Sequence, residues 1–98
     1  MSVEAYYAPV EETATIALDE LLKELSASGL PCTIEPESED MFWVVLAEHE
    51  SSILASVRDG QFVFGTFQYS LKDDTTVMDR VHEVMLKASY SAGEDSEI

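Results

Sequence analysis

The dipeptide Asp59-Gly60 lies between two stretches rich in β-branched and aromatic residues, 53–58 and 61–69. Asp-Gly in this setting is typical of a two-residue type I′ turn, because both turn positions need positive φ. The sequence therefore predicts a β-hairpin. A two-residue turn also sets the strand register, with Val57 opposite Phe62.

The hairpin register assigns side chains to two faces, since successive residues of a strand point in opposite directions. One face is expected to form the core, and it carries Ile53, Ala55, Val57, Phe62 and Phe64. The other face carries polar residues together with Leu54, Phe67 and Tyr69. An exposed apolar patch on that second face would be a candidate binding surface.

Two segments carry helical periodicity. Residues 11–28 are expected to form the first helix, with an apolar stripe at Ala14, Ala17, Leu18, Leu21, Leu22 and Leu25. Ile16 falls off this stripe, and Gly29-Leu30-Pro31 is a strong stop signal. Residues 75–90 are expected to form the second helix, with a stripe at Val77, Val81, Val84, Met85 and Ala88.

Between the helices, residues 32–34 and 41–47 favour strands in addition to the hairpin. The expected fold is α+β, a three- to four-stranded antiparallel meander sheet between an N-terminal and a C-terminal helix, in the order α-β-β-β-α. Short connections favour both helices on one face. The expected organisation is an N-terminal arm at 1–10, one compact domain at 11–90 and a disordered acidic tail at 91–98.

Charge restricts the partners that such a chain can bind. The 98 residues include 20 Asp and Glu but only 5 Lys and Arg, for a formal net charge of -15. This surface disfavours direct binding of nucleic acid or anionic membrane and attracts basic partners. The single cysteine, Cys32, fits a reducing compartment, and residues 1–12 do not resemble a signal peptide, so a cytoplasmic location is predicted.

No catalytic, metal or cofactor motif stands out. His49 and His82 have no ligand spacing around them, and Cys32 follows a helix end, where nothing local would lower its pKa. The acidic loop at 35–40 lacks the glycine and ligand pattern of a calcium loop. Trp43 could line a pocket, but core packing is the stronger interpretation. The chain is therefore predicted not to be an enzyme and to hold no metal or cofactor.

Three interpretations of function stay open. The first is a protein-binding module, such as an adaptor, inhibitor, immunity protein or secretion chaperone, whose partner is basic or exposes an apolar segment. The second is a nucleic-acid mimic that inhibits a DNA- or RNA-binding protein, and the third is a halophilic domain whose acidity is adaptation to salt. A homodimer also stays open. The candidate partner-binding residues are Asp19, Glu20, Glu24, Glu35, Glu37, Glu39, Asp40, Leu54 and Phe67.

The layout resembles that of two groups of proteins. From Leu18 to Phe67 the chain is similar to class I type III secretion chaperones, which also have a helix ending near Gly-Leu-Pro, here Gly29-Leu30-Pro31, then acidic strands and a final helix. The chain is shorter than those chaperones and would lack their last strands. Small phage-encoded inhibitors of CRISPR nucleases are similar in their helix, three strands, helix order and in their acidity. Neither resemblance supplies site residues.

Overall fold

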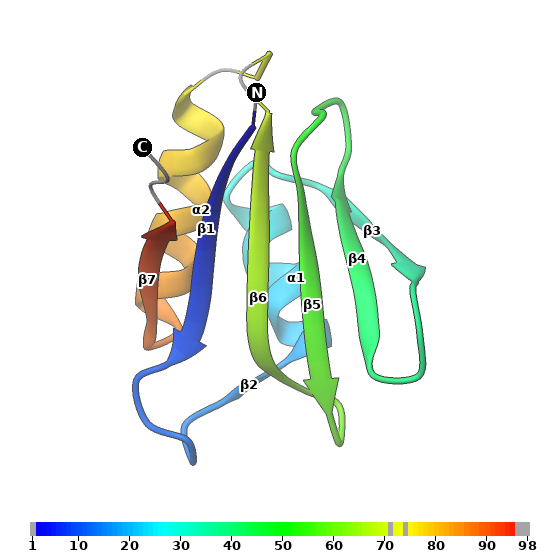
Figure 1. Cartoon of the computed structure of the whole chain (residues 1–98), viewed down its shortest axis with the longest axis vertical. Helices are drawn as coiled ribbons and strands as arrows, with labels where there is room; N and C mark the ends of the chain where they lie inside the picture. Colours follow the sequence, from blue (N-terminus) through cyan, green and yellow to red (C-terminus); the bar gives the residue numbers. More distant parts are fainter. Residues whose placement is uncertain (1, 71, 74, 96–98) are drawn as a thin grey trace.

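One antiparallel sheet with two helices on one of its faces makes up the described residues, 2–70, 72, 73 and 75–95, of this computed structural model (Figure 1). The sheet faces the viewer in Figure 1 and both helices lie behind it. Its strand order is β3-β4-β5-β6-β1-β7, with β2 pairing β6. The elements are β1 Ser2–Pro9, β2 Ile16–Ala17, α1 Leu18–Ala27, β3 Cys32–Pro36, β4 Met41–Leu46, β5 Ser52–Arg58, β6 Gln61–Ser70, α2 Thr75–Lys87 and β7 Tyr90–Asp95.

The expected three- to four-stranded sheet between two terminal helices is wrong. The sheet has 7 strands, and strands also precede the first helix and follow the second. The segment expected to be an arm is β1, and most of the segment expected to be a disordered tail is β7; residues 1 and 96–98 lie outside the described residues. Tyr7 of β1 pairs with Gly65 on one side and Ala92 on the other, so these strands depend on partners far along the chain that local patterns do not reveal.

The first helix starts later than its periodicity predicts. It begins at Leu18, whereas Ile16 lies in β2 opposite Phe62 and is half-buried. The position of Ile16 off the helical stripe has its explanation here, because this residue belongs to the sheet. The stop signal acts as expected: Gly29 has φ 87°, and the Leu30 amide donates to the Leu25 carbonyl oxygen over 2.9 Å. The second helix ends at Lys87, earlier than expected.

The hairpin turn has the backbone that its sequence predicts, with φ 53° at Asp59 and 79° at Gly60. Val57 pairs with Phe62 as expected, but the next pair is Ser56 with Phe64, which leaves Val63 as a β-bulge. A bulge inserts one extra residue and so turns every later side chain of that strand to the opposite face.

The bulge corrects three face assignments. Phe64, expected in the core, is 40 % exposed on the face that the helices leave open. Phe67 and Tyr69, expected on the outer face, are buried at 0 % and 5 % exposure. Leu54 keeps its expected place on the outer face, because β5 itself has no extra residue.

The core lies between the helices and the sheet and is centred on aromatic residues. The rings of Phe62 and Tyr90 have centroids 5.1 Å apart, and both residues are fully buried. The Tyr90 hydroxyl donates to the Phe62 carbonyl oxygen and accepts from the Ile16 amide over 3.0 Å, so it joins β7, β6 and β2. Burial raises the pKa of this phenol, although the bond from the Ile16 amide acts in the opposite direction. The other buried apolar residues are Ala5, Tyr7, Leu18, Leu21, Leu25, Leu30, Val44, Leu46, Ile53, Ala55, Phe67, Tyr69, Val77, Val81, Val84 and Met85.

We predict that Gly65→Ala destabilises the protein by about 1–3 kcal/mol, the usual cost of overpacking. A Cβ at Gly65 would lie 2.5 Å from Cζ of Phe62, whose ring is fully buried and packed against Tyr90. Gly93→Ala is the matched control, because a Cβ there meets no atom within 4 Å. Denaturant unfolding of both variants measures the effect, and equal stabilities would contradict the close approach of Phe62 to this strand.

Candidate functional site

The open face of the sheet presents a row of side chains that crosses five strands. Cross-strand pairing places Glu35 beside Trp43, Trp43 beside Leu54, Leu54 beside Thr66 and Thr66 beside Tyr6. Trp43, Leu54 and Tyr6 are each half-buried, although no helix lies over them (Figure 1). Side chains in neighbouring pairs of this kind contact one another, so the row is a continuous surface.

A second row lies next to the first and adds to its apolar character. Met41 pairs with Ser56, and Ser56 pairs with Phe64. The rings of Phe64 and Tyr6 are stacked, with centroids 6.1 Å apart and planes at 25°. We refer to Tyr6, Met41, Trp43, Leu54 and Phe64 together as the sheet-face patch.

Carboxylates stand at both sides of the sheet-face patch. Glu37 accepts a hydrogen bond of 2.8 Å from Nε1 of Trp43, which fixes the indole ring, and Glu35 lies opposite Trp43 on the same face. At the other side, Glu4 lies on β1 opposite Gln68. Arg58, which pairs with Gln61 at the end of β5, is the only Lys or Arg among the described residues paired across this face from β3 to β1, and Glu35, Glu37 and Glu4 outnumber it.

The structure separates the candidate residues into three groups. Glu35, Glu37, Glu39 and Asp40 are exposed in and around the β3–β4 turn, and Leu54 belongs to the sheet-face patch. Asp19, Glu20 and Glu24 are exposed on α1, in the helix layer behind the sheet. Phe67 is fully buried and has no surface to offer a partner. The acids of the helix and of the turn therefore do not all surround one surface.

Sequence reasoning missed Tyr6, Trp43 and Phe64 as parts of this surface. One signal was present: 41–46 is apolar at every position, which predicts a strand with both faces covered. The structure leaves the face of β4 that carries Trp43 without a helix over it, although Val44 and Leu46 on its other face are fully buried. An apolar patch on a face over which neither helix lies is a feature of binding surfaces.

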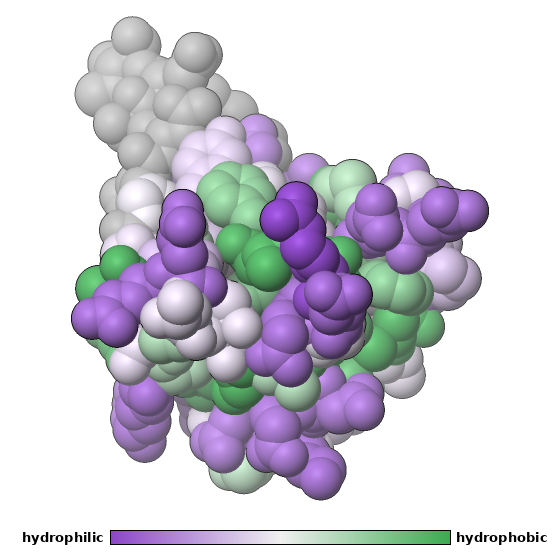
Figure 2. Space-filling model, turned by 90° about the horizontal axis from the view of Figure 1, so that it is seen from below, coloured by the Kyte–Doolittle hydropathy of each residue, from purple (hydrophilic) through white to green (hydrophobic). Residues whose placement is uncertain are grey.

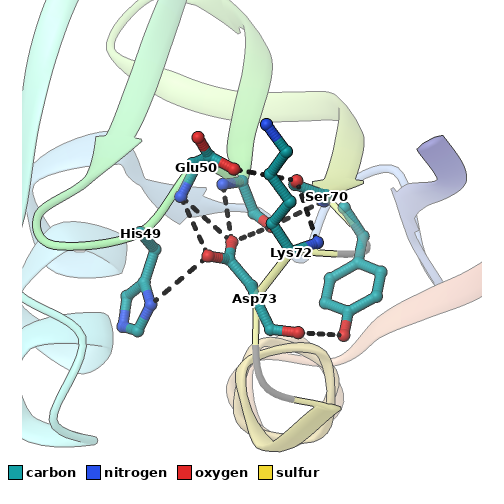
Figure 3. Close-up of polar contacts among 7 residues, drawn as sticks. His49, Glu50, Ser70, Lys72 and Asp73 are labelled. Carbon is teal, nitrogen blue, oxygen red and sulfur yellow. Dashed lines mark hydrogen bonds and ion pairs between the residues drawn. The ribbon is translucent and has the colours of Figure 1, made fainter. Parts of the chain in front are cut away.

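A second polar cluster surrounds Asp73, whose side chain is 7 % exposed (Figure 3). Its carboxylate accepts hydrogen bonds from the Glu50 amide at 3.0 and 3.1 Å, from the Ser51 amide at 2.8 Å and from the Ser51 hydroxyl. Nδ1 of His49 lies 3.8 Å from Oδ1. Desolvation alone would raise the pKa of Asp73, but the bonds from Ser51 and Glu50, with a smaller effect of His49, hold it below its ordinary value.

The Asp73 cluster contains the three residue types of a hydrolase triad, but not its geometry. In a triad the serine hydroxyl bonds to the imidazole, which in turn bonds to the carboxylate. Here the Ser51 hydroxyl bonds directly to Asp73 and also accepts from the Ser70 amide over 2.9 Å. These contacts join the β4–β5 turn to the segment before α2, which is a structural role.

The other candidate reactive residues are also engaged in packing. Nδ1 of His82 lies 2.8 Å from the Tyr7 hydroxyl and 3.1 Å from the Met78 carbonyl oxygen. Cys32 is half-buried, and burial raises the pKa of its thiol, which makes the nucleophilic thiolate scarcer. Within the described part of the chain, no three His, Cys, Asp or Glu residues are placed to hold a metal ion.

A shallow depression of about 370 Å³ lies at the lower end of the sheet, the end that Figure 2 shows. Its lining includes Arg58, Glu12, Thr15, Pro9 and Val63. Figure 2 shows hydrophilic side chains around exposed hydrophobic surface at this end of the molecule. Arg58 and Glu12 have opposite charges and both are exposed, so the depression favours neither an anionic nor a cationic ligand.

We predict that Asp73→Asn destabilises the fold by about 1–3 kcal/mol at neutral pH, because an amide NH₂ would face donors that now bond to a carboxylate. The pKa of Asp73 is lowered in the folded protein, so its stabilisation is complete above the unfolded-state pKa of about 3.9 and is lost as pH falls through the folded-state value. In thermal melts from pH 7 to 3, the difference in melting temperature between this variant and the wild type should therefore become smaller below about pH 4. Asp40→Asn removes the same charge from an exposed site and should change stability little; a pH-independent deficit in Asp73→Asn would contradict the role of its ionised form.

Comparison with known proteins adds no assignment: no protein-family model matches the chain, and no curated protein matches it significantly. Among the described residues, no helix has the length and apolar character needed to cross a bilayer.

Proposed function

We propose that this chain is a non-enzymatic protein-binding module that docks its partner on the open face of the sheet. The sheet-face patch is the observation that supports this most directly. Two helices cover one face of the sheet, while Trp43, Leu54 and Phe64 lie on the opposite face, over which neither helix lies. Burying aromatic and aliphatic residues of this kind is a main source of binding free energy at protein interfaces.

The absence of a working catalytic arrangement among the described residues supports the non-enzymatic part of the proposal. The carboxylate of Asp73 already accepts hydrogen bonds from backbone amides and from the Ser51 hydroxyl, and His82 is packed against Tyr7. A general base needs a reachable proton and a substrate-sized site beside it. Neither cluster lies on the sheet-face patch.

A nucleic-acid mimic needs an arrangement of acids that differs from the one on the open face. Such a protein needs carboxylates spread over its binding surface in place of phosphates, whereas the centre of the open face is apolar and its carboxylates stand at the sides. The mimic therefore remains the alternative, and would use a surface other than this patch.

Site-specific photo-cross-linking tests the proposal. A benzophenone amino acid at position 54, in the sheet-face patch, should give a discrete adduct with a partner protein in native lysate. The same amino acid at position 86 is the control, because Leu86 is 61 % exposed on α2, in the opposite layer. Identical adducts from both positions, or none from position 54, would argue against docking on the open face.

Salt dependence separates this proposal from the halophilic interpretation. Within the described residues, the ion pairs between Lys and an acid are Lys23–Glu20 at 3.9 Å and Lys87–Glu83 at 3.4 Å. We predict a cooperatively folded protein at about 0.1 M salt, with a melting temperature that rises further as salt screens the repulsion. A chain that unfolds at that salt and folds only at molar concentrations would support salt adaptation instead. Circular dichroism melts over the salt series decide between the two.

A further inference from the structure

The arrangement of charge around the sheet-face patch indicates what kind of partner it fits. Glu35 and Glu37 stand at the β3–β4 side, and Glu4 stands on β1 at the other side. We propose that the occupant is an amphipathic helix of a partner protein, with an apolar stripe flanked on both sides by Lys or Arg. This inference rests on the proposed function, since it names the partner chemistry of the same surface.

A helix suits the face of this sheet better than a strand does. A strand adds at a sheet edge through backbone hydrogen bonds, and the β3 edge is bracketed by Pro31 and Pro36, a device that discourages such pairing. A sheet face is instead covered by helices. The opposite face already shows this, where α1 packs through Leu18, Leu21 and Leu25, and α2 through Val77, Val81, Val84 and Met85.

The spacing of the acids matches the width of a helix. From β3 to β1 there are four strand spacings, about 19 Å in all. A helix with its side chains is about 10–12 Å wide, so a helix lying along the strands over Leu54 and Phe64 would have Glu35 and Glu4 just beyond its two sides. Long basic side chains reach outward from the border of an apolar stripe in this way while their stems remain on apolar surface.

Charge complementarity favours a basic helix over the other possible occupants. A second copy would bring another chain of net charge -15 against a face whose sides are already acidic. Nucleic acid and anionic lipid meet the same repulsion. A Lys or Arg beside Trp43 gains twice, from the carboxylates of Glu35 and Glu37 and from the indole face, which Glu37 holds in place.

A synthetic helix tests the proposal, and the protein supplies its own reporter because Trp43 is its one tryptophan. The probe is an 18-residue peptide without Trp, with a Leu stripe flanked on both sides by Lys. Three control peptides have Glu in place of Lys, Gln in place of Lys, or the Leu and Lys residues in an order that forms no stripe. Titration at 0.1 M and 0.5 M salt follows the emission of Trp43, and calorimetry confirms the affinities.

Two matched double variants distinguish the effect of the acids beside the patch from the long-range effect of the net charge. Glu35→Gln with Glu37→Gln removes two charges beside the patch and keeps an acceptor for the Trp43 indole. Glu20→Gln with Glu24→Gln removes two charges from α1, in the opposite layer. We expect the first pair to weaken binding of the Lys–Leu peptide about 3- to 10-fold and the second pair less than about 2-fold, as usual for exposed ion pairs.

Leu54→Asp should weaken binding of the Lys–Leu peptide by at least about tenfold, because it places a charge in the apolar contact. Phe64→Ser provides a second test if Leu54→Asp disturbs the fold, since Phe64 is already 40 % exposed. Circular dichroism melts verify that each variant is folded.

The possible failures are distinguishable. If the Gln–Leu peptide binds as tightly as the Lys–Leu peptide and Leu54→Asp abolishes both, the face docks helices without regard to charge; this inference fails and the proposed function stands. If the unstriped peptide binds equally well, or both double variants weaken binding equally, the attraction is diffuse and the inference fails. If sedimentation shows a dimer that Leu54→Asp dissociates, a second copy occupies the patch. If Leu54→Asp and Phe64→Ser leave binding of the Lys–Leu peptide unchanged, the sheet-face patch is not the binding surface, and both proposals are wrong.

Discussion

The bulge at Val63 is the local feature on which both faces of the sheet depend. Before it, Phe62 points into the core; after it, Phe64 points outward and Phe67 inward. Without the extra residue, Phe64 would take the inward position and Phe67 would face solvent, since a one-residue slip reverses every side chain of a strand. Gly65 comes two residues after the bulge, and its lack of a side chain leaves room for the Phe62 ring. One inserted residue thus both completes the core and exposes an aromatic ring on the open face.

The two ends of the chain complete this arrangement. β1 lies between β6 and β7, which brings Tyr6 beside Phe64 and buries Tyr7 on the opposite face. β7 brings Tyr90, whose ring contacts Phe62 and whose hydroxyl bonds to β6 and β2. The terminal strands are therefore part of the core, and β1 also supplies one side of the sheet-face patch.

The effect of the acids on the choice of partner depends on where they lie relative to the sheet-face patch. A uniformly negative surface would repel every acidic partner, but it would not distinguish one basic partner from another. On the open face, carboxylates flank an apolar centre, so in the proposed mode of binding attraction by charge and burial of apolar surface would act at the same place. Interfaces commonly combine an apolar centre with a polar rim. The acids of α1 lie in the other layer and would contribute to long-range attraction only.

Local sequence determined the elements whose signals are short-range. The Asp59-Gly60 turn, the Gly29 helix end and the apolar stripes of both helices follow from backbone preferences and periodicity within a few residues. Leu54 and the acids near the patch were identifiable as candidates on the same basis. Tertiary structure alone decided that 2–9 and 90–95 are strands, that Ile16 belongs to the sheet, and that Phe64 and Phe67 exchange faces. Each of these depends on a partner strand remote in sequence, and hydrogen bonding between such strands overrides local preference.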